Sequence, residues 1–138
     1  MLDNIRSGQH VRCTSWLTLL SAVPTAEERS LHEEALELAE RFQLTEKLDH
    51  RAGDLSYGEK KRLEIARALA SRPRVLLLDE PAAGMNPSEL QWLNTTLTEI
   101  RDSGIAVLLV EHHMKLVMSV CDEIVVLNFG SKIAEGPP

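Results

Sequence analysis

The chain has 138 residues, of which 43% are hydrophobic and 26% are charged, with a formal net charge of −6 and a pI near 5.4. This length and apolar share predict a globular fold with one modest core. The acidic balance argues against nucleic acid as a partner, because a sequence-independent grip on phosphates needs a basic surface.

The first 30 residues carry the weakest secondary-structure signals. We expect a short helix around Leu2 to Gly8 and a helix start near Pro24. The apolar run from Trp16 to Val23 is shorter than the roughly 20 residues of a membrane-spanning helix, and no signal peptide is predicted. The two cysteines, Cys13 and Cys121, lie outside disulfide or zinc-ligand spacing, which favours a reducing compartment.

From about residue 30 to about residue 72, apolar residues recur mostly at helical spacing. Apolar residues recur on one face from Leu31 to Phe42 and predict an amphipathic helix. A second helix is expected from Ser56 to about Ser71, because Ser56 and Glu59 form a capping pair and Pro73 stops the pattern.

After Pro73 the pattern changes to strand, helix, strand. The short apolar runs Val75 to Leu78 and Ile105 to Val110 are typical of parallel strands covered on both faces. Between them, Asn86 followed by Pro87 marks the start of a helix.

The last residues predict a short helix from His113 to Val120, a third strand from Ile124 to Leu127, and a turn into an edge strand. We therefore predict an α/β chain with a parallel sheet. Its two parts are a helical subdomain, residues 1–72, and an α/β part, residues 73–138.

Two carboxylates end the first strand, at the edge where open α/β sheets bind ligands. Asp79 would hold Mg²⁺, directly or through water, and Glu80 would orient or deprotonate an attacking water. A buried strand with a polar turn before Pro81 explains this motif equally well by itself.

The segment from Leu55 to Glu59 puts a hydroxyl, a glycine and free N–H groups at a helix N-terminus. Such a terminus attracts an anion, for example a nucleotide γ-phosphate. The alternative is a plain capping box.

Taken in series, these motifs resemble those of ABC ATPases. The segment from Leu55 to Glu59 resembles the signature motif, and the strand ending in Asp79 and Glu80 resembles Walker B. Residues 62–69 resemble the helix after the signature, and residues 81–86 the D-loop. The segment from Val110 to His113 resembles the switch-histidine segment, although a lone histidine after a strand is more often structural.

Residues 79–87 and 111–118 resemble in particular the importers of branched-chain amino acids. The resemblance implies the back half of a P-loop NTPase-like catalytic core in an ATP-binding and ATP-hydrolysing subunit. It further implies Mg²⁺ and ATP as cofactors, a second ATP-binding subunit (identical or different), transmembrane permease subunits, and a cytoplasmic place at the inner face of the cell membrane.

The resemblance also assigns residues. Glu80 and His112 are implied as catalytic, Asp79 as the metal ligand, and Ser56, Tyr57, Gly58, Glu59 and Asn86 as cofactor-binding, with Ser56 and Gly58 acting on nucleotide held by the second subunit. The chain departs from the family pattern at Tyr57 and Glu59, where a second glycine and a glutamine are usual, at Asn86, which replaces an aspartate, and at His113, where an acid is common.

The 138 residues contain no GxxxxGK[ST] phosphate loop. The family's Walker A lysine, adenine-stacking aromatic and Q-loop glutamine would precede Met1, and Gln9 and Gln43 are assigned no such role. We therefore expect a fragment that hydrolyses no ATP alone, because phosphoryl transfer depends on positioning and charge. The alternatives are an interaction module that docks on a membrane subunit or completes a partner's ATP site, and a truncated product whose exposed strands self-associate.

Overall fold

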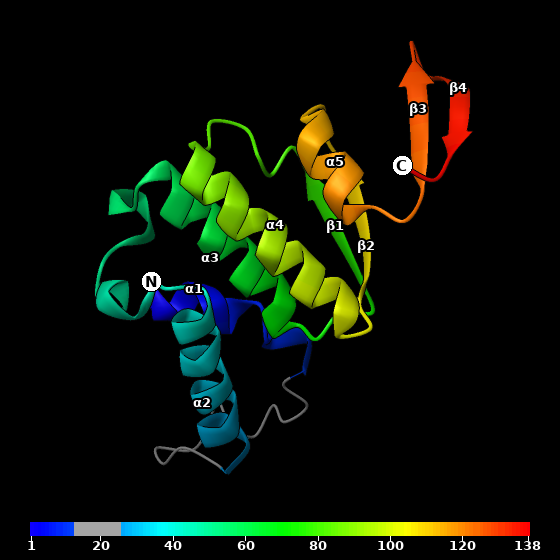
Figure 1. Cartoon of the computed structure of the whole chain (residues 1–138). Coiled ribbons are helices and arrows are strands. Elements are labelled where there is room, and N and C mark those ends of the chain that lie inside the picture. Colours follow the sequence, from blue (N-terminus) through cyan, green and yellow to red (C-terminus); the bar gives the residue numbers. More distant parts are fainter. Residues whose placement is uncertain (13–25) are drawn as a thin grey trace. The chain divides into compact units, whose positions relative to one another are not determined.

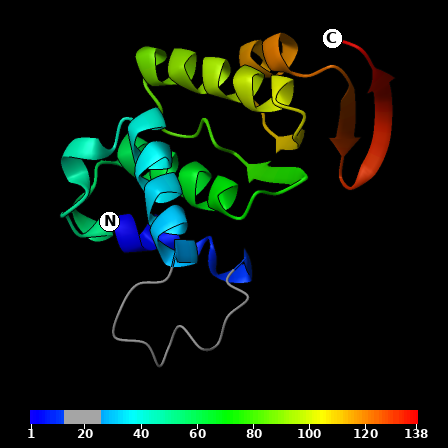
Figure 2. The same ribbon diagram turned by 90° about the horizontal axis from the view of Figure 1, so that it is seen from below.

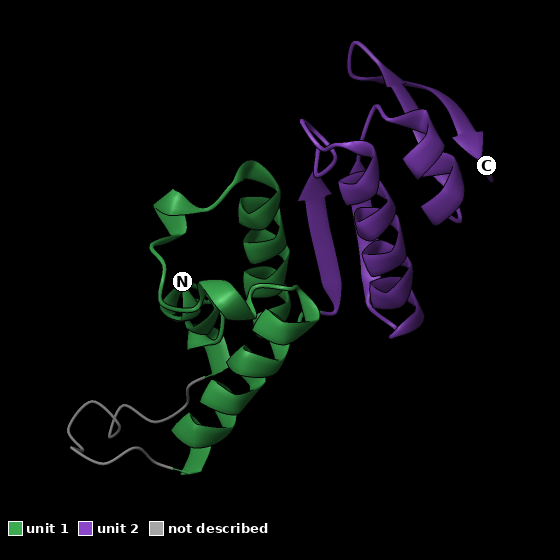
Figure 3. Ribbon diagram, turned by 60° about the vertical axis from the view of Figure 1, so that its left-hand side comes forward, with its two compact units in different colours: residues 1–73 green, residues 74–138 purple. Residues whose placement is uncertain are grey.

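The structure, a computed structural model, describes residues 1–12 and 26–138 (Figure 1). They form two compact units, residues 1–73 (unit 1) and 74–138 (unit 2), coloured separately in Figure 3. The expectations for Cys13, for the run from Trp16 to Val23 and for a helix start near Pro24 lie outside the described residues. In the part that is described, no helix has the length and apolarity to cross a membrane.

Among its described residues, unit 1 has three α-helices, α1 (Leu2–Ser7), α2 (Ala26–Arg41) and α3 (Tyr57–Ala70), together with short 3₁₀ turns. Helix α1 contacts both longer helices (Figure 2). The predictions for α1 and α3 are confirmed, and α2 contains most of the predicted amphipathic stretch but begins earlier. The core of unit 1 consists of apolar side chains from the three helices and the turns, including Ile5, Ala35, Ala39, Phe42, Leu44, Leu63, Ile65 and Ala66.

Both glutamines that were assigned no role at the sequence level have structural partners in unit 1. Gln9 is buried, and its Nε2 donates to the carbonyl of Leu31 at 2.7 Å. Gln43 accepts a hydrogen bond from the Arg62 guanidinium at 2.6 Å. These contacts satisfy polar groups that tie α2 to the helices beside it.

A carboxylate between two arginines also fastens unit 1. Glu34 on α2 accepts hydrogen bonds from Arg12 at 2.6 and 3.1 Å and from Arg72 at 2.6 Å. Arg12 also donates to the carbonyl of Ala70 at the end of α3. The hydrogen bonds from Arg12, helped by the positive charge of both arginines, hold the pKa of Glu34 below its ordinary value.

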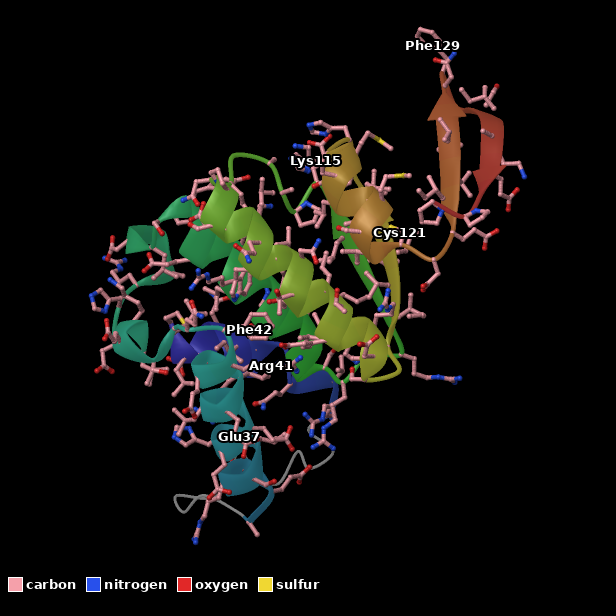
Figure 4. The ribbon with its side chains drawn as sticks, in the orientation of Figure 1. Glu37, Arg41, Phe42, Lys115, Cys121 and Phe129 are labelled. Carbon is pink, nitrogen blue, oxygen red and sulfur yellow. The ribbon has the colours of Figure 1, made fainter. Side chains whose placement is uncertain are left out.

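This lowered pKa predicts an acid-sensitive contribution to stability. A carboxyl whose folded-state pKa is depressed stabilises the fold above its unfolded-state pKa, and the effect is lost as the pH falls through the folded-state value. We expect Glu34→Gln to cost about 1 kcal/mol at pH 7 and progressively less below about pH 4.3. Urea unfolding followed by circular dichroism, at pH 7 and below about pH 4.3, measures this cost. The control is Glu37→Gln, which changes an exposed residue of the same helix (Figure 4). An equal cost at both pH values would contradict it.

Unit 2 begins with the predicted strand, helix and strand: β1 (Val75–Asp79), α4 (Pro87–Asp102) and β2 (Ala106–Val110). The two strands are parallel, as predicted, with Leu77 opposite Leu108 and Asp79 opposite Val110. Helix α4 packs against β2 and against α5 (Met114–Val120). This arrangement brings the carboxyl ends of β1 and β2 side by side.

Burial of both sheet faces, expected from the sequence, is not found among the described residues. Leu76 of β1 is 2% exposed, whereas its neighbours Val75 and Leu77 are 54% and 68% exposed. Leu108 and Val110 of β2 are likewise more than half exposed. Successive side chains of a strand point to opposite faces, so one face of the pair is buried or half-buried and the other is open.

The third predicted strand, β3 (Ile124–Asn128), pairs antiparallel with β4 (Ser131–Gly136) in a sheet separate from β1 and β2. The two residues between them, Phe129 and Gly130, have φ values of 45° and 79°. Positive φ at both positions is the requirement of the tight hairpin turn that matches strand twist. Phe129 lies fully exposed at the tip (Figure 4).

Candidate functional site

The pairing of β1 with β2 brings together two of the residues singled out by the sequence. Because Asp79 is opposite Val110, Glu80 and His112 follow on neighbouring strands, and the Glu80 N–H donates to the Val110 carbonyl at 2.9 Å. His112 Nδ1 lies 3.5 Å from Glu80 Oε1. Their side chains are 75% and 56% exposed, so both reach solvent at the sheet edge.

Glu80 has a strained backbone. Its φ is 43°, in the left-handed region that residues other than glycine seldom adopt. Such a conformation costs about 1 to 3 kcal/mol and persists where neighbouring contacts fix it. Here the Glu80 N–H is bound to β2, and its carbonyl accepts from the Ala83 N–H at 3.2 Å. The strain turns the chain sharply between Asp79 and the loop of residues 81–86.

Asp79 ends β1 with its side chain exposed beside Glu80. Within residues 1–12 and 26–138, no group of three or more His, Cys, Asp and Glu side chains could enclose a metal ion. Mg²⁺ does not require such a group, because it usually keeps water and is held by one or two carboxylates together with phosphate oxygens. The exposed carboxylate of Asp79 is of the type that such an ion accepts.

The N-terminus of α3 in unit 1 carries the capping box considered as the alternative interpretation. Ser56 Oγ accepts from the Glu59 N–H at 3.3 Å, and Glu59 Oε2 accepts from the Ser56 N–H at 2.7 Å. These hydrogen bonds lower the pKa of Glu59, and Lys47 Nζ lies 3.7 Å from its second oxygen. The acid thus turns its charge toward its own helix, a position compatible with an anion beyond the terminus.

The other residues of this terminus differ in exposure. Ser56 and Tyr57 are exposed, and Gly58 is buried. The Lys61 ammonium lies 5.7 Å from the centre of the Tyr57 ring. An exposed hydroxyl and aromatic ring above the first turn of a helix form a surface that a phosphate can approach.

Asn86 caps α4 in unit 2. Its side-chain oxygen accepts from the N–H groups of Ser88 and Glu89, each at 3.0 Å, and Glu89 returns a hydrogen bond to the Asn86 N–H. The capping role that the sequence suggested is therefore confirmed. It fixes the end of the 81–86 loop to a rigid helix.

Glu111 was not assigned a role from the sequence, yet it joins two loops of the site. Its carboxylate accepts hydrogen bonds from the N–H groups of Ala82, His112 and His113. The available signal was its position, since an acid that follows an apolar parallel strand lies at the ligand-binding edge. His113, where the family commonly has an acid, is the N-cap of α5 and forms no side-chain cap.

Comparisons with known proteins agree with this architecture. The family model described as ABC transporter matches residues 4–83. The chain is 44% identical over 141 residues to the high-affinity branched-chain amino acid transport ATP-binding protein BraF of Pseudomonas aeruginosa, covering 99% of this chain and 55% of that protein. The corresponding LivG of Escherichia coli (strain K12) is 39% identical over 143 residues, covering 100% and 56%. The chain thus spans about half the length of the curated relatives it matches.

Solved structures give the same picture of the fold. A nucleotide-free ATP-binding cassette from an ABC transporter superposes with a TM-score of 0.79 at 31% identity, covering 99% of this chain and 54% of that one. The ADP conformation of MJ1267, another ATP-binding cassette, superposes with a TM-score of 0.78 at 32% identity and the same coverage. The predicted α/β fold with a parallel sheet is therefore confirmed as part of such a cassette.

Proposed function

The chain belongs to the ABC transporter family, and from this premise we propose that it is part of an ATP-binding subunit that powers import of branched-chain or other hydrophobic amino acids. In support, the relatives that match 99% and 100% of this chain are named as high-affinity branched-chain amino acid transport ATP-binding proteins. The observation that supports ATP hydrolysis most directly is the position of Glu80 beside His112 at the carboxyl ends of two parallel strands.

In this proposal the residues of unit 2 serve the chain's own nucleotide. Asp79 would hold Mg²⁺, which neutralises charge on the phosphates when it is bound. Glu80 orients or deprotonates the attacking water, and His112 contacts the γ-phosphate. The strained backbone at Glu80 sets the direction in which its side chain leaves the chain before the substrate arrives, which is the kind of preorganisation that phosphoryl transfer uses.

The residues of unit 1 act on the nucleotide of a second ATP-binding subunit. The start of α3 offers Ser56, Tyr57 and Gly58, with Glu59 turned back onto the helix, and so presents N–H groups and a hydroxyl to an anion. Asn86, at the end of the 81–86 loop, would face the same composite site. Transmembrane permease subunits complete the transporter, which places this subunit at the inner face of the cell membrane.

A second candidate rests on the absence of a GxxxxGK[ST] string from the 138 residues. The chain would then be an interaction module whose α3 terminus completes the ATP site of a partner, or whose helical unit docks on a membrane subunit. It would hydrolyse no ATP itself, because nothing in its sequence supplies the lysine and the cradle of N–H groups for the triphosphate.

The two candidates are separated by a chimera in which this chain replaces the matching segment of the P. aeruginosa relative. We expect the chimera to bind and hydrolyse Mg-ATP, and the 138-residue chain alone to do neither in calorimetry and phosphate-release assays. A chimera that binds ATP without hydrolysing it would favour the interaction module. Tight binding of ATP by the 138-residue chain alone would contradict both assignments of the nucleotide site.

A further inference from the structure

Glu111 differs from Glu59 and Glu89, two other acids of the described residues that bind backbone N–H groups. Glu59 and Glu89 each return to the N-cap residue of their own helix, three residues away. Glu111 Oε1 instead accepts from the Ala82 N–H at 2.7 Å, 29 residues away in the sequence. Its second oxygen, Oε2, accepts from the N–H groups of His112 at 3.0 Å and His113 at 3.2 Å. Each oxygen therefore serves a different loop.

The loop on the Ala82 side is a fixed series of turns. Ala82 is 8% exposed, its carbonyl accepts from the Met85 N–H at 3.2 Å, and Gly84 adopts a φ of 70°. The loop then ends at Asn86, which caps α4. A displacement of this loop would consequently pull on Ala82, which the carboxylate of Glu111 holds.

The other side of the same carboxylate holds the backbone that carries His112. The imidazole of His112 in turn approaches Glu80, whose carbonyl begins the 81–86 loop. Glu80, the loop, Glu111 and His112 therefore form a closed ring of contacts. A carboxylate suits the position of Glu111 in this ring, because the three N–H donors lie on two sides and both oxygens of a carboxylate accept. Its negative charge also strengthens these hydrogen bonds.

We propose that Glu111 is a positioning residue that clasps the 81–86 loop to the His112 backbone, so that a movement of either loop is transmitted to the other. The clasp follows from the contacts in unit 2, and its effect on hydrolysis rests on the function proposed above. In a dimer of ATP-binding subunits, it would make the position of His112 depend on whatever the 81–86 loop contacts.

The clasp is tested in the 138-residue chain by amide hydrogen exchange. We expect Glu111→Ala to speed exchange at Ala82, His112 and His113 at least about fivefold, the change that loss of one hydrogen bond produces. Exchange at Leu78 in β1 should stay unchanged, as it should at all four positions in the control Glu123→Ala, which removes an exposed acid of the same unit. Unchanged exchange at the three amides, or equally faster exchange throughout β1 and β2, would overturn the proposal.

Glu111→Gln sharpens the result, because a carboxamide has one acceptor oxygen and presents donors from its nitrogen. We expect it to retain protection on one side, either at Ala82 or at His112 and His113, and to lose it on the other. Protection kept on both sides would show that the charge and both oxygens are not needed, and would contradict a two-sided clasp.

Transmission is read from the imidazole of His112. Asn86→Ala should shift its NMR signals in the otherwise unchanged chain, and the shift should fall at least about threefold when Glu111→Ala is also present, because coupled residues respond non-additively. In the chimera, Glu111→Ala should lower kcat about tenfold with KM for ATP changed less than twofold, and Glu111→Asp should recover part of the loss. If Asn86→Ala shifts the His112 signals equally with and without Glu111→Ala, transmission is overturned. This NMR test does not depend on whether the chimera hydrolyses ATP.

Discussion

In the chimera that carries this chain, Glu80→Gln is expected to slow ATP hydrolysis by at least about 100-fold, the contribution typical of a general base, while ATP remains bound. The substitution keeps the size of the side chain and its hydrogen-bonding reach, so the fold should not change. It removes the negative charge that a water-activating group needs. Single-turnover hydrolysis and equilibrium binding of ATP, measured on the same preparation, separate the two effects.

The matched control is Glu123→Gln, which changes an exposed acid in the same unit and should leave the rate within about twofold. A Glu80→Gln rate within threefold of the unsubstituted chimera would remove Glu80 from the mechanism. Loss of ATP binding together with hydrolysis would assign Glu80 to holding the nucleotide or its ion instead.

The strained backbone supplies a second test at the same position. At a φ of 43° glycine is free of the steric cost that glutamate bears, so Glu80→Gly should stabilise the chain against urea by up to about 1 kcal/mol and still abolish hydrolysis. Stability gained while activity is lost is the expected signature of strain kept for function. Destabilisation by glycine would show instead that the glutamate side chain supports the fold.

The elements of the fold were largely predictable because their signals are local. A capping serine and a proline bracket α3, Asn86 and Pro87 open α4, and apolar runs mark β1 and β2. The pairing partner of β3 was not predictable, since the spacing of apolar residues does not say which strand lies beside it. The turn predicted after this strand is confirmed at Phe129 and Gly130, and it pairs β3 with β4 in a hairpin; the positive φ of Phe129 was not predictable, because phenylalanine seldom adopts it.

The candidate site was predictable where the chemistry follows the end of a strand. Asp79 ends β1, Glu80 follows it directly and His112 lies two residues after the end of β2, so parallel pairing alone predicts that they meet at one edge. The clasp of Glu111 depends on the folding of a loop 29 residues away, and no local pattern encodes such a contact. The partners of Glu34 are separated in sequence in the same way.

The reason for a glycine at position 8 is not visible in the sequence, and its substitution is expected to destabilise unit 1 strongly. A glycine after a helix is usually explained by a left-handed backbone, but Gly8 caps α1 with an ordinary φ of −67°. Its constraint is space, because a Cβ at Gly8 would lie 2.1 Å from the carbonyl oxygen of Arg67 in α3. The absent side chain therefore lets α1 pack directly on the backbone of α3.

Gly8→Ala is accordingly expected to destabilise unit 1 by about 3 kcal/mol, the upper end of the cost of overpacking, since the clash is with a helix backbone that cannot turn aside. Urea unfolding followed by circular dichroism measures it. Gly53→Ala is the matched control, because a Cβ there meets no atom within 4 Å, and it should be neutral or slightly stabilising.

A second substitution identifies the cause of the destabilisation. The Cβ of Ala70 would lie 3.1 Å from the new methyl group, a milder contact than the one with Arg67. If the backbone contact dominates, Ala70→Gly will not rescue Gly8→Ala, and the two costs will add. Recovery of stability in the double variant would instead place the clash between side chains. An unchanged stability in Gly8→Ala itself would mean that α1 does not approach α3 this closely.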